Sequence, residues 1–330
     1  MSEPELATKA PESDANETII PGDTPAQTGP TMGEHCTTDR PTRTLSSITY
    51  LPFSGDALAQ IAYISKPASY PASPAKLLLL LTGGTGLQSA NNQIQSDKFA
   101  DEGFVVVMPD LFGGDPAPNS AALPEAEAST SFLDNFKLKA VETAKSFMID
   151  MWLARHTEEK VMPLLEKVIE ACKSEFADAV AAGDGVYAVG YCFGARYILL
   201  LAAERTVPQA GWSGAQKPAD EEAGEAAGSH TKGPFIKAGA LAHATLVSPS
   251  DFEGLKQPIS LVCVESDPMF PDEVRTKGED LMSKGNLEHE VQVYPGVPHG
   301  FAVFGDYEDA HIKDAQVTAH EQMLKWLKEH

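Results

Sequence analysis

The chain has 330 residues, a formal net charge of −22 at pH 7 and 42% hydrophobic residues, as in an acidic globular protein of one large or two ordinary domains. The excess of 47 acidic over 25 basic residues argues against binding to nucleic acid or to an anionic membrane, because their phosphate groups would be repelled. We therefore expect a soluble enzyme whose partner is a small-molecule substrate.

Residues 1–45 are rich in Pro, Thr, Glu, Asp and Gly and lack apolar periodicity. Such a segment buries too little apolar surface to order itself, so we expect a flexible leader followed by a single domain over 46–330. The first ten residues contain neither the basic nor the apolar region of a secretory signal, and no later stretch is long and apolar enough to span a membrane. The expected location is cytoplasmic.

Apolar runs and helical patterns alternate from residue 59 to the C-terminus. Runs such as Leu77–Leu81 and Phe104–Met108 are continuously apolar, which is typical of buried parallel strands. This alternation predicts an α/β fold, with a mainly parallel central sheet between helices. A polar stretch at about 206–233 is typical of a surface insertion. The predicted strands are 59–64, 77–81, 104–108, 186–189, 238–243, 259–264 and 291–294, and the predicted helices are 91–102, 132–155, about 157–180, 195–204, 272–284 and 309–329.

Gly190 to Gly194 form a G-x-C-x-G pattern between a predicted strand and a predicted helix, with Cys192 at its centre. Glycine at both flanks indicates a nucleophile elbow, a sharp turn whose strained backbone leaves no room for neighbouring side chains. Unpaired N–H groups at the start of the helix would favour the thiolate of Cys192. The alternative is a small buried hydrophobic cysteine in an ordinary turn.

An acid and a base follow two later strands, in the order nucleophile, acid, histidine that is typical of α/β-hydrolases. Asp267 comes just after the strand 259–264 and could hold an imidazole in one tautomer. His299 lies in a loop rich in Gly and Pro after the strand 291–294, and it is the predicted base. The alternatives are a turn-forming or helix-capping Asp267 and an exposed loop histidine.

An oxyanion hole needs two backbone N–H donors directed at the developing negative charge. Phe193, directly after the cysteine, is the first predicted donor. The second is expected in the glycine-rich loop after the strand 77–81, where we favour Gly84 and keep Gly83 as the alternative. Such a loop could instead bind phosphate, but neither a G-x-G-x-x-G pattern nor a P-loop lysine is present.

The number and spacing of the four cysteines bear on metal binding and on disulfide formation. Cys36, Cys172, Cys192 and Cys263 lack the paired spacing of a metal site and are too sparse for a disulfide framework in a chain of this length. We therefore expect free thiols in a reducing compartment and no bound metal.

From about Glu34 to the C-terminus the sequence resembles the dienelactone hydrolase family, and especially its fungal members. That resemblance implies a cofactor-free, single-domain α/β-hydrolase fold with a Cys, Asp, His triad, assigned here to Cys192, Asp267 and His299. The same three residues follow from the spacing. The motifs that carry the resemblance are Gly190–Ala195, Pro109–Phe112, Asp267 with Phe270 and Pro271, Trp152–Ala154, and His299–Val303.

Two departures from the family pattern concern the substrate. An acidic residue commonly stands at the position of Gly83, where glycine cannot help to control the ionisation of the thiol. The arginines that bind a substrate carboxylate in the best-known bacterial members have no counterparts, and Phe304 stands where fungal relatives often carry arginine. Arg155 and Arg196 are candidate replacements, with solvated surface arginines as the alternative. A muconate-type lactone acid is therefore not the expected substrate.

The resulting hypothesis is a carboxylic ester hydrolase that cleaves small esters, lactones or thioesters through an acyl-thioester on Cys192. The substrate contacts would come from Gly83, Arg155, Arg196 and Phe304. Two alternatives stay open: a non-hydrolytic protein whose thiol serves ligand binding or redox sensing, and a lyase or isomerase on the same scaffold. The sequence leaves the oligomeric state open, a homodimer included.

Overall fold

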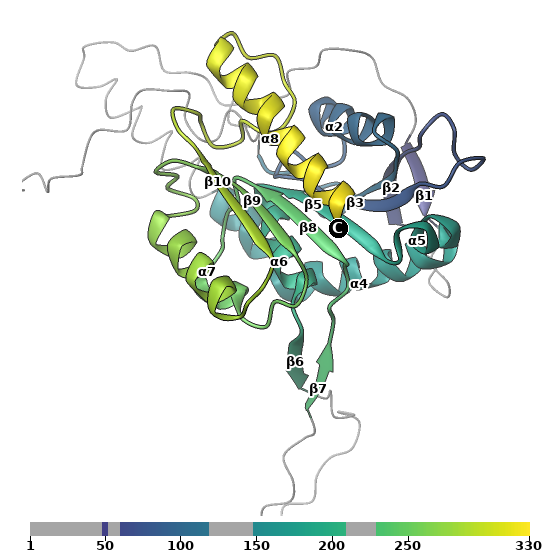
Figure 1. Ribbon diagram of the computed structural model, residues 1–330, viewed down its shortest axis with the longest axis horizontal. Helices are drawn as coiled ribbons and strands as arrows, with labels where there is room; N and C mark the ends of the chain where they lie inside the picture. Colours follow the sequence, from purple (N-terminus) through teal and green to yellow (C-terminus); the bar gives the residue numbers. More distant parts are fainter. Residues whose placement is uncertain (1–47, 52–59, 119–147, 209–228) are drawn as a thin grey trace, which may run out of the picture.

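The computed structural model describes residues 48–51, 60–118, 148–208 and 229–330 (Figure 1). The predicted leader, much of the second predicted helix and the middle of the predicted insertion lie outside these residues. None of the described helices has the length and apolar character that crossing a bilayer requires.

An eight-stranded sheet forms the centre of the molecule, in the order β1-β2-β4-β3-β5-β8-β9-β10. Strand β2 runs antiparallel to both of its neighbours, and every pair from β4 to β10 is parallel. The predicted mainly parallel sheet is thus confirmed. The strands are β1 (Ile48–Leu51), β2 (Gln60–Ser65), β3 (Lys76–Leu81), β4 (Phe104–Pro109), β5 (Val186–Tyr191), β8 (Ala238–Ala242), β9 (Ile259–Val264) and β10 (His289–Tyr294).

Helices cover both faces of this sheet and enclose two buried apolar clusters (Figure 1). One cluster lies under α2 and α8, and the other lies under α4, α5, α6 and α7. The central strands β4, β5, β8 and β9 are buried along their whole length, which explains their continuous apolar runs. The helices are α2 (Ala90–Asp101), α4 (Glu158–Glu175), α5 (Ala177–Gly183), α6 (Phe193–Ala202), α7 (Asp272–Lys284) and α8 (Ala310–Glu329).

Several elements differ from the sequence prediction, and strand β1 was not among the predicted strands. The helical segment after Thr157 is divided at Phe176, whose side chain is buried in the core and whose backbone leaves the helical region. Helix α6 begins at Phe193, directly after the cysteine. The ends of the polar stretch pair as a two-stranded antiparallel sheet, β6 (Arg205–Pro208) with β7 (Ser229–Lys232), which projects from the body of the molecule (Figure 1).

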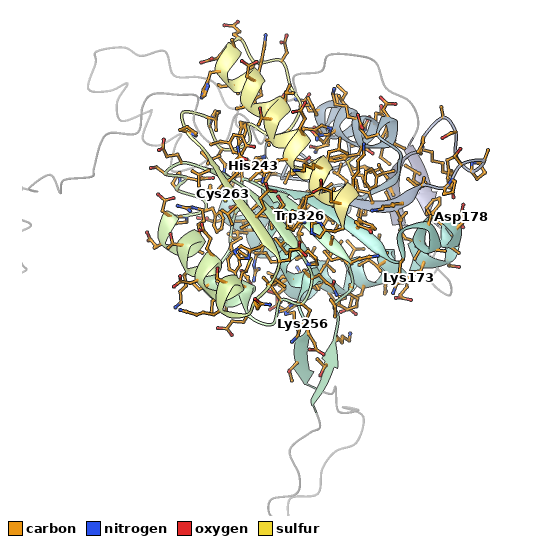
Figure 2. All side chains as sticks on the ribbon, viewed as in Figure 1. Lys173, Asp178, His243, Lys256, Cys263 and Trp326 are labelled. Carbon is orange, nitrogen blue, oxygen red and sulfur yellow. The ribbon has the colours of Figure 1, made fainter. Side chains whose placement is uncertain are left out.

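The carboxyl ends of the parallel strands lie together along one edge of the sheet, and their amino ends lie along the opposite edge. His243 lies at the edge where the parallel strands end, and Lys256 lies toward the opposite edge (Figure 2). The loops after β3, β5, β8, β9 and β10 therefore meet at the first edge, which is where open α/β sheets place their sites.

Candidate active site

Cys192 occupies a strained turn between β5 and α6. Its backbone angles are φ 49° and ψ −113°, a conformation that non-glycine residues rarely adopt. A Cβ atom at Gly190 would lie 2.6 Å from Ile198 Cγ1. At Gly194 it would lie 2.4 Å from the carbonyl oxygen of Leu81. Both glycines are therefore needed for close packing, as the elbow pattern predicts.

Asp267 and His299 form a buried pair at the ends of β9 and β10. Asp267 Oδ2 lies 2.7 Å from His299 Nδ1, and the two residues are only 2% and 5% exposed. Asp267 Oδ1 also accepts a hydrogen bond of 2.9 Å from the backbone N–H of Met269. The carboxylate thus orders its own turn and orients the imidazole at once, which unites the two interpretations of Asp267.

The electrostatic environment of His299 involves Cys192 directly. Burial by itself would lower the pKa of His299, but the charge of Cys192 and hydrogen bonds with Asp267 and Cys192 outweigh it and raise that pKa to about 10. The three residues come together from loops that are far apart in the sequence, and the arrangement favours an imidazolium opposite a thiolate.

The glycine loop after β3 lies against the elbow. A Cβ atom at Gly83 would lie 3.1 Å from Cys192 Cβ and 3.8 Å from its Sγ. One at Gly84 would lie 2.8 Å from Ala117 Cβ. The backbone of this loop can therefore approach the cysteine closely, and Phe193 is the first residue of α6. The donor roles of Phe193 and Gly84 stay predictions.

A cluster of aromatic side chains lines the side of the elbow next to Gly84. The rings of Phe112, Trp152 and Phe193 lie 4.9 to 5.2 Å from one another, and each residue is at most 5% exposed. The carboxylate of Asp110 accepts bonds from the backbone N–H groups of Phe112 and Gly114, at 3.0 and 2.7 Å, and so holds this loop. The motifs at 109–112 and 152–154 thus meet beside the elbow.

Arg196, the second candidate for a carboxylate clamp, pairs with carboxylates of the protein itself. Its guanidinium donates to both carboxylate oxygens of Asp251, at 3.0 and 2.9 Å, and to Glu158 at 2.8 Å. The group joins α6 to α4 and to the short 3₁₀ helix Pro249–Phe252, so it is engaged within the protein. Its side chain is 20% exposed, so it is not a solvated surface arginine, and its role as a substrate contact stays a prediction.

The other predicted substrate contacts have protein partners as well. Arg155 pairs with Asp115 through Nε at 2.8 Å, on the exposed side of the aromatic cluster. The ring of Phe304 lies 5.0 Å from the ring of His320 and 4.1 Å from Lys98 Nζ. Their roles as substrate contacts stay predictions, and Gly83 is the predicted contact that lies beside the sulfur.

His243 is a buried neighbour of the site that the sequence analysis placed at the end of a strand and gave no role. It follows β8, is fully buried and has φ 36°. Its ring centre lies 5.0 Å from that of His299 and 5.9 Å from that of Tyr191. The available signal was a polar residue at the carboxyl end of a parallel strand beside the elbow strand.

Comparisons with known proteins show the family of this chain. The sequence model of the dienelactone hydrolase family matches residues 61–330. The hydrolase tropI of Talaromyces stipitatus is 25% identical over 279 residues, which are 83% of this chain and 89% of that protein. Dienlactone hydrolase 1 of Gibberella moniliformis is 24% identical over 282 residues, with 83% and 88% covered.

Solved structures show the same fold. An esterase of Thermogutta terrifontis with propionate bound has a TM-score of 0.53 at 15% identity, over 84% of this chain and 93% of its own. A Klebsiella pneumoniae structure described as a candidate dienelactone hydrolase has a TM-score of 0.56 at 16% identity, over 86% and 98%.

Proposed function

Because the chain belongs to the dienelactone hydrolase family and is a hydrolase of α/β fold, we propose that it cleaves small ester, lactone or thioester substrates with Cys192 as nucleophile. The observation that carries the proposal is the buried imidazole of His299, which lies 2.7 Å from the Asp267 carboxylate and whose pKa is raised by the charge of Cys192. A cysteine in a strained elbow beside such a base is an activated nucleophile.

In the first half-reaction, the Cys192 thiolate attacks the substrate carbonyl. A carbon–sulfur bond forms while the π electrons of the carbonyl move onto its oxygen, and the N–H groups of Phe193 and Gly84 bind this oxyanion. As the tetrahedral intermediate collapses, the bond to the alcohol oxygen breaks and His299 Nε2–H protonates the leaving group. The product is an acyl-thioester on Cys192 and a neutral imidazole.

In the second half-reaction, water resolves the thioester. The neutral imidazole of His299 removes a proton as water attacks the carbonyl carbon, and the carbon–sulfur bond then breaks to release the acid and the Cys192 thiolate. Asp267 keeps the imidazole in one tautomer and stabilises its charged form in both steps. Thioesters and esters suit this sulfur chemistry better than amides do.

An uncharged substrate fits the surroundings better than a lactone acid. Both arginines considered as carboxylate clamps already pair with carboxylates of the protein, and the chain carries a net charge of −22. The aromatic cluster of Phe112, Trp152 and Phe193 adds an apolar wall at the elbow. The esterase of T. terrifontis that holds propionate gives a precedent for short acyl groups on this fold.

The test is hydrolysis of short p-nitrophenyl esters by the wild-type protein and by Cys192→Ala. The variant should lose on the order of 10³-fold or more in kcat/KM, because the nucleophile and its part of the triad are removed together. Intact mass spectrometry of the wild type should show an acyl adduct that maps to Cys192. Equal rates from the two proteins would rule out the mechanism.

Cys263→Ala is the matched control. Burial raises the pKa of the Cys263 thiol to about 12, so this cysteine is chemically inert at neutral pH. Its removal should leave the rate unchanged. A thiol adduct on Cys192 without turnover of any ester would instead support a ligand-binding or redox-sensing role.

A further inference from the structure

A buried glutamine on α2 lies between the strand that ends at Cys192 and the loop that follows His299. Gln95 is 1% exposed, although glutamine is a residue that usually faces solvent. Its Nε2 donates to the hydroxyl of Tyr191 at 2.8 Å and lies 3.3 Å from Nδ1 of His320. Its Oε1 accepts a bond of 2.9 Å from the backbone N–H of Phe304.

The partners of Gln95 are placed next to the reacting groups. Tyr191 is the last residue of β5 and directly precedes the cysteine. Phe304 lies five residues after His299 in the loop between β10 and α8. One amide group therefore connects the strand that carries the nucleophile to the loop that carries the base.

The remaining side-chain bonds to this loop have a different reach. Gln316 Nε2 on α8 donates to the carbonyl oxygens of Phe301 and Val303, at 3.0 and 2.8 Å. The Tyr307 hydroxyl donates to the carbonyl oxygen of Gly300 at 3.3 Å. The bonds of Gln316 hold the loop to α8, and the bond of Tyr307 joins two residues within the loop. The amide of Gln95, in contrast, extends from this loop to Tyr191 at the end of β5.

The neighbours of Gln95 are uncharged, which suits a buried amide. Burial lowers the pKa of His320 to about 4, so its ring is neutral at physiological pH and can accept from the amide. Burial likewise holds the pKa of Tyr191 well above its ordinary value. Because the backbone N–H of Phe304 needs an acceptor, the orientation of the amide is determined by its partners.

We propose that Gln95 is a positioning residue, which sets the relative placement of Cys192 and His299 by binding Tyr191 and the loop after the base together. This inference rests on the proposed function of that pair. It explains why a polar side chain is kept in an apolar interior: a fully satisfied buried network specifies one arrangement of the elements that it joins. A displacement of the reacting groups by about 1 Å lowers the rate on the order of 10²-fold, so the effect of correct positioning on the rate can equal the energy of several hydrogen bonds.

The experiment replaces Gln95 with methionine, which is also linear and fills a similar volume but makes none of the three bonds. We measure the rate at which iodoacetamide modifies Cys192 as a function of pH, with peptide mapping to identify the modified cysteine. Withdrawal of the imidazolium destabilises the thiolate, so the midpoint of the profile should rise by about one pH unit, which is a tenfold change in the ionisation equilibrium. The kcat for ester hydrolysis should fall by about tenfold or more.

A second pair of variants keeps the test decisive if Gln95→Met does not fold. Tyr191→Phe removes one hydroxyl that Gln95 binds, and Tyr187→Phe removes a buried hydroxyl from the other end of the same strand, where it donates to Gly183. Tyr191→Phe should shift the alkylation profile in the same direction, and Tyr187→Phe should leave it unchanged.

Two outcomes would overturn the inference. One is a folded Gln95→Met or Tyr191→Phe protein with the wild-type alkylation profile. The other is an equal shift in Tyr187→Phe, which would mark a general effect of lost stability. The alkylation profile does not require turnover. Failure of the proposed hydrolysis would therefore be seen separately, as a wild-type protein that cleaves no ester although its Cys192 is alkylated with the expected pH dependence.

Discussion

At the scale of single residues, the pair of Cys192 and His299 dominates the chemistry. The folded-state pKa of His299 is raised from 6.5 to about 10, although burial alone would lower it. Its contribution to the free energy of unfolding is therefore complete below about pH 6.5 and is lost as the pH rises through about 10. The same proton is needed by the leaving group, so activity and this part of the stability should decline together in alkaline solution.

Replacing the carboxylate that orients His299 tests this coupling. In Asp267→Asn, the bond that helps to raise the pKa of His299 is weakened, so the alkaline limb of kcat/KM should move to lower pH. The value of kcat/KM itself should fall by about 10³- to 10⁴-fold, because the tautomer is no longer held. Steady-state rates on a p-nitrophenyl ester across the alkaline range give both quantities.

Asp184→Asn is the control for this prediction, since the Asp184 side chain is 96% exposed and its backbone conformation suits asparagine. It should keep the wild-type profile. An Asp267→Asn protein with an unchanged alkaline limb would contradict the assignment of that limb to His299.

At the scale of elements, the contact between β3 and the start of α6 places the nucleophile. Gly194 N–H donates to the carbonyl of Thr82 at 3.0 Å, and its Cα faces the carbonyl of Leu81 without space for a side chain. The two elements can therefore approach only through glycine, and this approach brings the glycine loop to Cys192. The glycines of the elbow motif are therefore needed for the contact between β3 and α6 as well as for the turn itself.

Gly194→Ala should destabilise the fold although alanine favours helices. The helix gain over glycine is about 1 kcal/mol, whereas a Cβ atom 2.4 Å from the Leu81 carbonyl oxygen forces backbone atoms apart at a cost of about 2 to 4 kcal/mol. The expected net loss is about 1 to 3 kcal/mol in the free energy of unfolding, measured by urea denaturation. Gly285, the C-cap of α7, has a right-handed conformation, and a Cβ atom there would lie 3.3 Å from the Leu281 carbonyl oxygen, so Gly285→Ala should destabilise much less than Gly194→Ala. Equal stability of the two variants would contradict the close approach.

At the scale of the whole molecule, an ion-pair network joins four segments on one face of the sheet. Arg196 on α6 binds Glu158 on α4 and Asp251 of the 3₁₀ helix, and Glu158 also binds Arg205 at the start of the β6–β7 hairpin. The Asp251 side chain is 5% exposed, so it depends on this partner and on Ser248. The network holds together the face of the molecule opposite α2 and α8.

Arg196→Met should therefore lower stability without changing substrate preference. Methionine keeps much of the apolar stem but leaves the Asp251 carboxylate without a cation, which costs about 2 kcal/mol because the bonds from Ser248 remain. Urea denaturation measures the loss. The ratio of kcat/KM for p-nitrophenyl butyrate to that for its anionic analogue mono-p-nitrophenyl succinate should be the same in the variant as in the wild type. A selective loss of activity on the anionic ester would instead show that Arg196 binds the substrate carboxylate.

Much of the fold was predictable because its signals are local. Central strands such as β9 and helices such as α7 have the bounds that their apolar runs and caps predict, since a buried strand must be apolar on both faces. The division of the helix at Phe176 was not predictable from periodicity, because the burial of one ring overrides it. The pairing of β6 with β7 joins polar segments that carry no strand pattern.

The family, the parallel sheet and the meeting of Cys192, Asp267 and His299 could all be read from the amino-acid sequence, because the loops that follow parallel strands gather at one end of the sheet. Which side chains pair with one another within that frame became known from the folded structure. The partner of Arg196 lies 55 residues away, and the partners of Gln95 lie 96 and 209 residues away. Such pairs depend on packing and on the direction of each side chain, which no local pattern of residues encodes.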